Sequence, residues 1–200
     1  MADPRDVVSK HAKYRTGNPI SRRLVAGFLR TVGQLVAPLG VGSALDVGCG
    51  EGLVLMSLRE HLEQATCAAI DLDPREAADA ARNLPWCDVH VGSAYALPFH
   101  DASFELVMCC EVLEHVDDPE QALKELARVA SKHVLLSVPR EPIWRGMNML
   151  RGSYWKDWGN TPGHLNHWST GSFERFVTSR LVVRRRETPL PWTVLLADKR

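Results

Sequence analysis

The sequence lacks several features that would place it in other protein classes. Its formal net charge is +0 at pH 7, so no overall field draws it to nucleic acid or to an anionic membrane. No apolar run approaches the ~20 residues needed to cross a bilayer. The five cysteines form no C-x-x-C pair, and the first residues lack the apolar centre of a signal peptide. We therefore expect reduced thiols, a cytoplasmic location and no integral membrane segment.

The composition is that of a globular protein. The chain has 200 residues, of which 45% are hydrophobic and 24% charged, and this length suits one domain with a substantial core. We predict a single domain over residues 1–200. Within it we expect a helical cover over residues 1–40 and a loop-rich insert over residues 140–168.

Patterns typical of strands and helices alternate along the chain. Short apolar runs predict strands near residues 43–48, 67–71, 88–91, 104–110, 133–138, 181–187 and 192–198. Amphipathic patterns predict helices within residues 3–37, near 51–63 and 74–83, from Pro119 onward and near 170–179. Strands that alternate with helices form parallel βαβ units, so the sequence predicts an α/β fold.

A glycine-rich turn follows the first predicted strand. Residues 45–52 read Leu-Asp-Val-Gly-Cys-Gly-Glu-Gly, and glycine allows backbone angles and close ligand approach that other residues resist. The N–H groups that open the next helix favour a negatively charged group. Asp71 ends the second predicted strand, where a carboxylate can hold both hydroxyls of a ribose. These features predict a nucleotide or nucleoside pocket at the carboxyl ends of the first strands.

The G-x-G-x-G spacing, with Asp46 in the strand before it, resembles the cofactor loop of class I S-adenosylmethionine-dependent methyltransferases. Segments 70–74, 97–104 and 111–116 follow in the order of that family. The resemblance covers residues 43–139 and is closest to methyltransferase type 11 proteins, including ubiquinone-pathway O-methyltransferases. It implies a Rossmann-like, doubly wound sheet of about seven strands, mostly parallel, which ends in an antiparallel C-terminal hairpin strand.

The same resemblance implies S-adenosyl-L-methionine as cofactor and S-adenosyl-L-homocysteine as product. Gly48 and Gly50 would form the cofactor loop. Asp46 would organise this loop or bind the methionine ammonium group, and Asp71 would hold the ribose.

Five further positions follow from the family's pattern. Leu72 would lie against the adenine, near Ser93 and Ala94. Ser93 stands where relatives often carry an aspartate, and its hydroxyl makes a weaker, neutral hydrogen bond. Cys110 would lie beside the methionine portion of the cofactor, and Arg23 would pair with the methionine carboxylate.

Two histidines are the candidate catalytic residues. Histidine exchanges a proton near neutral pH, so His115 or His164 could remove the proton of an oxygen acceptor. The alternative is that each makes only structural hydrogen bonds. Glu111 and His115 are four positions apart and could share a helical face. Because no further pair stands at ligand spacing, we predict no metal site.

The expected function is methyl transfer to a small-molecule acceptor, most simply O-methylation. Tryptophans, a tyrosine and histidines in residues 140–168 predict a cover over an apolar or ring-containing acceptor. N- or C-methylation, of a small molecule or a protein, and a non-catalytic nucleoside-binding module remain as alternatives. The glycine spacing counts against a nicotinamide-dependent oxidoreductase. We expect no nucleic-acid partner, and a monomer or homodimer.

Overall fold

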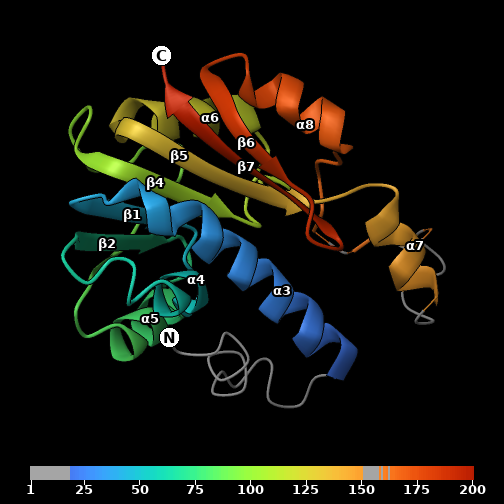
Figure 1. Ribbon diagram of the computed structural model, residues 1–200, viewed down its shortest axis with the longest axis horizontal. Helices are drawn as coiled ribbons and strands as arrows, with labels where there is room; N and C mark the ends of the chain where they lie inside the picture. The colour runs from blue at the N-terminus through green and yellow to red at the C-terminus, as the bar shows by residue number, and fades with distance from the viewer. Residues whose placement is uncertain (1–18, 151–157, 159, 162) are drawn as a thin grey trace.

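The computed structural model describes residues 19–150, 158, 160–161 and 163–200. The predicted helix before residue 18 and the insert residues Tyr154 and Trp155 lie outside the described residues. A seven-stranded sheet forms the centre, in the order β3-β2-β1-β4-β5-β7-β6 (Figure 1). The strands are β1 (Ser43–Val47), β2 (Thr66–Asp71), β3 (Asp88–Val91), β4 (Phe104–Cys110), β5 (Ala130–Pro139), β6 (Leu181–Glu187) and β7 (Trp192–Lys199).

The strand pairing agrees with the fold predicted from the sequence. Neighbouring strands from β3 to β5 run parallel, whereas β7 runs antiparallel to both β5 and β6. The chain builds β1, β2 and β3 toward one edge and then returns to place β4 on the other side of β1. In such open sheets, ligands bind at the carboxyl ends of the strands where the order reverses. Here that point lies between β1 and β4.

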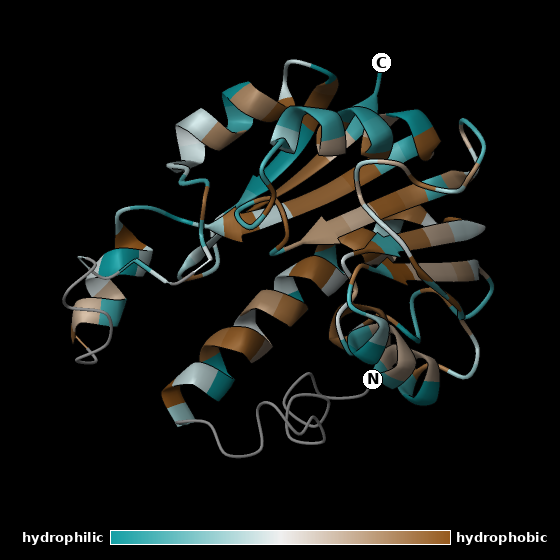
Figure 2. Cartoon of the chain, turned by 180° about the vertical axis from the view of Figure 1, so that it is seen from behind, coloured by the Kyte–Doolittle hydropathy of each residue, from teal (hydrophilic) through white to brown (hydrophobic). Residues whose placement is uncertain are grey.

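Helices cover both faces of the sheet, as the family resemblance implied. They are α3 (Pro19–Val36), η1 (Ala37–Leu39), α4 (Leu53–Ser57), α5 (Pro74–Asn83), α6 (Pro119–Val129), α7 (Ile143–Leu150) and α8 (Thr170–Val177). One apolar cluster joins α3, α4 and α5 to the sheet, and a second joins α6 and α8 to it. Figure 2 shows the hydrophobic colour concentrated in the central strands and along α3. In the part of the chain described, no helix is long and apolar enough to cross a membrane.

Two helices differ from the sequence-based expectation. The helix predicted near residues 51–63 is only α4, after which the chain continues in turns. Leu58 and Leu62 are both buried, and turns bury residues at this spacing as a helix would. The second difference is α7, which lies inside the segment expected to be loop-rich. Figure 1 shows it beyond the carboxyl end of β5, away from the other helices.

The packing of α6 gives a test of the core. Leu123 is fully buried against the sheet, whereas its neighbour Lys124 is exposed on the same helix. We expect Leu123→Ala to lower the free energy of unfolding by about 2–5 kcal/mol, through lost burial and the cavity left behind. Urea denaturation measures this change, and Lys124→Ala is the control, with an expected change below about 0.5 kcal/mol. Equal effects in the two variants would contradict this packing.

Candidate functional site

The glycine-rich turn is held in shape by β2 and by the segment after β4. The N–H groups of Gly48 and Cys49 donate to the Ile70 carbonyl at 2.7 and 3.2 Å. Gly48 has a φ of +73°, and a Cβ at this position would lie 2.3 Å from a methyl group of Val112. Two independent features therefore require glycine at position 48: the left-handed backbone and the close approach of Val112.

Asp71 joins the end of β2 to this turn. One carboxylate oxygen accepts a hydrogen bond from the Gly50 N–H at 2.7 Å, and the other accepts from the Asp73 N–H at 2.9 Å. Asp73 in turn caps α5, where its side chain accepts from the Arg75 N–H at 2.8 Å. Since each carboxylate oxygen carries two lone pairs, Asp71 retains acceptor capacity toward a ligand.

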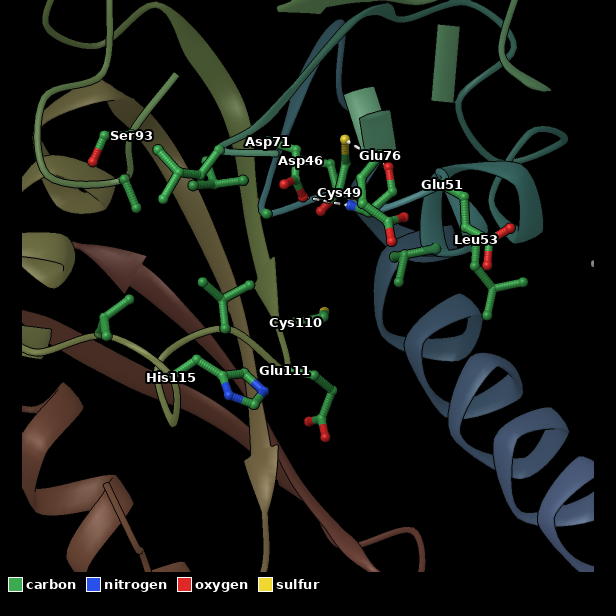
Figure 3. A pocket seen from close by; sticks show the side chains of 18 of the residues that line it. Asp46, Cys49, Glu51, Leu53, Asp71, Glu76, Ser93, Cys110, Glu111 and His115 are labelled. Atoms are coloured by element: carbon green, nitrogen blue, oxygen red, sulfur yellow. Dashed lines mark hydrogen bonds between the residues drawn. The ribbon is translucent and has the colours of Figure 1, made fainter. Parts of the chain in front are cut away.

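A cavity of about 560 Å³ opens at the carboxyl ends of β1, β2 and β4, within the range of ligand sites in proteins. Most of the predicted cofactor residues line it: Asp46, Gly48, Gly50, Asp71, Leu72, Ser93, Ala94 and Cys110. The candidate base His115 lines it too. Figure 3 shows Asp46 and Asp71 at the glycine turn, with Glu111 and His115 on the side of β4.

Two predicted site residues are not among the residues that line the cavity. Arg23 is exposed on α3, although Val25, Phe28 and Leu29 of that helix do line the cavity. His164 is buried nearby, with its ring centroid 4.8 Å from that of His115. The roles proposed for both residues stay predictions.

Several residues that line the cavity were not predicted from the sequence. Phe28, Glu76, Tyr95 and Trp192 line the cavity. Phe28 belongs to the apolar stripe of α3, and periodicity does not tell which members of a stripe meet the sheet and which meet a ligand. Trp192 starts β7 and packs against Phe28 at a centroid distance of 5.1 Å, a contact that only the folded chain reveals.

Most titratable side chains of the cavity lining are carboxylic acids. They are Asp46, Glu51, Asp71, Glu76, Glu111 and Asp117. The lining also includes His115, and the described lining residues include no lysine or arginine. Burial, with a smaller effect of Asp71, raises the pKa of Asp46 to about 7. Such a concentration of carboxyl groups favours a ligand that carries positive charge.

Glu111 occupies a strained position at the end of β4. Its φ is +59°, which is uncommon for a residue other than glycine. Its carboxyl group accepts hydrogen bonds from the Ser137 hydroxyl at 2.8 Å and from the Trp192 indole at 2.6 Å. Burial nevertheless raises the pKa of Glu111. Strained, half-buried titratable groups of this kind concentrate at functional sites.

Residues 163–166 of the insert bind to the turn that contains His115. The N–H groups of Leu165 and Asn166 donate to the Glu114 carbonyl at 2.7 and 3.1 Å. The Asn166 amide donates to two further carbonyls of the turn, those of Leu113 and Val116. These contacts place His164 beside His115 although the two are far apart in sequence.

Two tryptophans among the described residues of the insert pack against the rest of the fold. Trp144 stacks on His164 at 5.8 Å and also contacts Trp192 at 6.1 Å between ring centroids. Trp168 packs against Phe173 of α8, and Trp158 is 76% exposed. None of the described residues of the insert lines the cavity itself. The expectation that the insert covers the acceptor stays a prediction.

The cysteines show no sign of reactivity. All five are free, and four of them are buried. Burial raises the pKa of the Cys110 thiol well above its ordinary value, so this residue is a neutral thiol at physiological pH. A catalytic thiolate at the end of β4 is therefore not supported.

Part of the chain is similar to known proteins. Residues 45–138 match a family model described as a methyltransferase domain. The demethylmenaquinone methyltransferase of Roseiflexus castenholzii is 34% identical over 118 residues, 56% of this chain and 50% of the relative. The norajmaline N-methyltransferase of Rauvolfia serpentina is 36% identical over 93 residues, 44% of this chain and 32% of the relative. The chain thus aligns with between a third and a half of these relatives' lengths.

A solved structure extends the likeness over nearly the whole chain. The magnesium protoporphyrin IX methyltransferase of Synechocystis PCC 6803, determined with bound SAH, superposes with a TM-score of 0.71. The match covers 99% of this chain and 94% of that structure at 17% identity. At this identity the likeness shows the fold, which includes α3 and the strands outside residues 45–138.

The buried carboxyl group of Asp46 predicts a pH dependence of stability. Its pKa rises from 3.8 to about 7 on folding, so the folded state holds a proton that the unfolded state releases at lower pH. This contribution is fully present below about pH 4 and is lost as the pH rises toward 7. We expect Asp46→Asn to flatten this part of the decline in unfolding free energy, measured by urea denaturation from pH 4.5 to 8. The Glu63→Gln variant, at an exposed position, is the control. Identical pH profiles for Asp46→Asn and the unmodified protein would contradict the assignment.

Proposed function

We propose that this protein transfers a methyl group to a small-molecule acceptor. The premise is that residues 45–138 are a class I S-adenosylmethionine-dependent methyltransferase domain. The observation that supports this most directly is the acidic cavity between the glycine turn, Asp71 and the end of β4. O-methylation is the finer form of the proposal, and N- or C-methylation is its alternative.

The residues of the cavity fit S-adenosylmethionine in size and in charge. A volume of about 560 Å³ suits a nucleoside with an amino-acid arm. The ligand carries positive charge on its sulfonium and ammonium groups, and the acidic lining is complementary to both. The absent side chain at Gly48 leaves its backbone open to close approach. The glycine turn therefore suits this ligand better than a ligand with several phosphates, which the carboxylates would repel.

Each part of the cofactor has residues in the cavity that would hold it. Asp71 would accept hydrogen bonds from the ribose hydroxyls, and Leu72, Ser93 and Ala94 would contact the adenine. Asp46 and the segment at Cys110 would face the methionine arm. Because the described lining offers no lysine or arginine, the methionine carboxylate would be held by backbone N–H groups or by Arg23 from α3.

The cofactor supplies a methyl group already activated by its attachment to a sulfonium. The protein then has to hold the acceptor in line at near-attack distance, and such positioning lowers a barrier by about 7–11 kcal/mol. Phe28, Val112 and Trp192 give the cavity an apolar wall, which excludes water. On the side of β4, Glu111 and His115 provide polar groups toward an acceptor.

Two observations support a small acceptor over a macromolecule. The relatives include enzymes named for the methylation of demethylmenaquinone and norajmaline. Both names denote ring-containing small molecules. An aromatic or polycyclic acceptor also suits the aromatic side chains of Phe28, Tyr95 and Trp192 in the cavity wall.

Asp71 gives the test of the cofactor site. We expect Asp71→Asn to weaken the binding of S-adenosylhomocysteine about tenfold or more, because it removes charge-assisted hydrogen bonds worth about 1.5–3 kcal/mol. Isothermal titration calorimetry measures the affinity. Asp88→Asn, at the exposed first residue of β3, is the matched control and should bind like the unmodified protein. Unchanged affinity in Asp71→Asn would show that Asp71 does not bind the cofactor. Stabilisation of the protein by NAD, and not by S-adenosylhomocysteine, would contradict S-adenosylmethionine as the cofactor.

Methyl transfer itself is tested with S-adenosylmethionine that carries a radiolabelled methyl group. We expect label to appear in a small phenolic, amine or quinol-type acceptor from a metabolite extract, and to be lost with Asp71→Asn. Chemical analysis of the product tells O- from N- or C-methylation, because a methyl ether, a methylamine and a methyl–carbon bond differ in stability to acid and in NMR shift. Tight binding of S-adenosylhomocysteine with no transfer to any pool would favour a non-catalytic nucleoside-binding module.

A further inference from the structure

Three side chains with metal-binding atoms converge beside the cavity. Glu114 and His115 belong to the turn after β4, and His164 comes from the insert. One ligand atom from each lies within 4.8 Å of the other two. Because residues 163–166 are bound to this turn through backbone hydrogen bonds, the convergence is a built feature of the fold.

Glu114 lacks the partners that a buried carboxyl group needs. Its side chain is 2% exposed, and its Oε2 atom is buried without a hydrogen-bond partner. Its Oε1 atom lies 4.0 Å from Nε2 of His115, beyond hydrogen-bond distance. An unpaired polar atom in this environment is unfavourable by several kcal/mol unless a ligand or ion satisfies it. The free oxygen of Glu114 is thus an independent sign that this group binds something.

The hydrogen bond of His115 leaves its Nε2 atom free to bind a metal ion. Its Nδ1 atom lies 2.9 Å from the Gly163 carbonyl oxygen, and since a carbonyl only accepts, Nδ1 carries the proton. A neutral ring in that tautomer has its lone pair on Nε2, the nitrogen on the side of Glu114. Metal-bound histidines commonly donate their other N–H to a backbone carbonyl in this way, which fixes the ring orientation.

We propose that Glu114, His115 and His164 bind one divalent transition-metal cation. Two imidazoles and one carboxylate suit Zn²⁺, Mn²⁺, Fe²⁺ or Co²⁺, whereas Mg²⁺ and Ca²⁺ prefer oxygen ligands alone. Ligand atoms bound at about 2.1 Å to one ion lie at most about 4.2 Å apart, so small side-chain rotations from the present 4.8 Å complete the site. The three protein ligands leave coordination positions open for water or a substrate oxygen.

The position of this group suggests what the cation does. His115 lines the cavity and is half-exposed, whereas Glu114 and His164 are buried behind it. A cation held there meets the cavity on the side of β4, opposite the glycine turn (Figure 3). Resting on the proposed function, we infer that it would bind the acceptor oxygen and lower the pKa of its hydroxyl. The hydroxyl proton would then leave to water, the oxygen would take the methyl group from the sulfonium, and the two histidines would serve as ligands.

Cobalt binding tests the site without reference to catalysis. Full-length protein without an affinity tag is stripped with a chelator and titrated with Co²⁺, while visible absorption and calorimetry are recorded. We expect one equivalent to bind with a ligand-field spectrum, and the affinity to fall at least tenfold in Glu114→Gln and in His164→Gln. Glu63→Gln and His100→Gln, both at exposed positions, are matched controls that should bind as the unmodified protein does.

A positioning variant and a folding control sharpen the result. Asn166 binds no ion itself but ties the insert to the turn through two carbonyls, so Asn166→Ala should weaken Co²⁺ binding by about 10- to 100-fold. Binding of S-adenosylhomocysteine in every variant shows that the fold is intact. If a ligand variant does not fold, paramagnetically shifted imidazole protons in the unmodified protein still count the bound histidines, and two are expected.

Three results would overturn the proposal: no saturable Co²⁺ binding, equal affinity in Glu114→Gln and Glu63→Gln, or fewer than two shifted imidazoles. Cation binding without methyl transfer would instead refute the proposed function and leave the site standing. Methyl transfer that survives chelation unchanged, with Co²⁺ bound as expected, would limit the inference to the site and remove the cation's role in catalysis.

Discussion

The turn of residues 111–116, which follows β4, is held from three directions, and the shape of the cavity depends on it. Val112 packs against Gly48 of the glycine turn. Glu111 is bound by Ser137 of β5 and by Trp192 of β7. On the third side, the Glu114 carbonyl accepts two N–H groups of the insert. Parts of the chain that are distant in sequence therefore share one short segment, and a shift of that segment would alter both the cofactor side and the acceptor side of the cavity.

The same turn concentrates carboxyl groups where little water reaches. Glu114 is buried and Glu111 half-buried, and burial raises the pKa of each. Asp46 and Asp71 add two more carboxyl groups across the cavity, where repulsion from Asp71 adds to the effect of burial on the pKa of Asp46. A folded chain keeps such an arrangement only at a loss of stability, which a positively charged ligand would recover on binding. The carboxyl groups of the lining are thus complementary to a positively charged cofactor.

The sequence predicted the sheet and its glycine turn well because both depend on local signals. Buried parallel strands read as short apolar runs, and the turn needs glycine at fixed spacing. It predicted less well where tertiary contacts decide the outcome. Helix α7 is amphipathic but lies within the segment that was expected to be loop-rich. Helix α4 ends at Ser57 although Leu62, in the turns that follow, is still buried. No metal site was predicted from the sequence, because spacing along the chain does not reveal the contacts of Gly163, Leu165 and Asn166 that bring His164 beside Glu114.

The environment of His164 decides how its role should be understood. Burial, with smaller effects of the neighbouring histidines and Arg145, lowers the pKa of its imidazole to about 4. A general base works best when its pKa lies near the operating pH, and at pH 7 this ring takes up a proton only weakly. A ring that stays neutral is also the form that binds metals. The burial that makes His164 a poor proton acceptor thus leaves it suited to hold a cation beside Glu114. His115 lines the cavity, but its Nε2 atom would bind the same cation, so His115 is a candidate base only if the cation site is refuted.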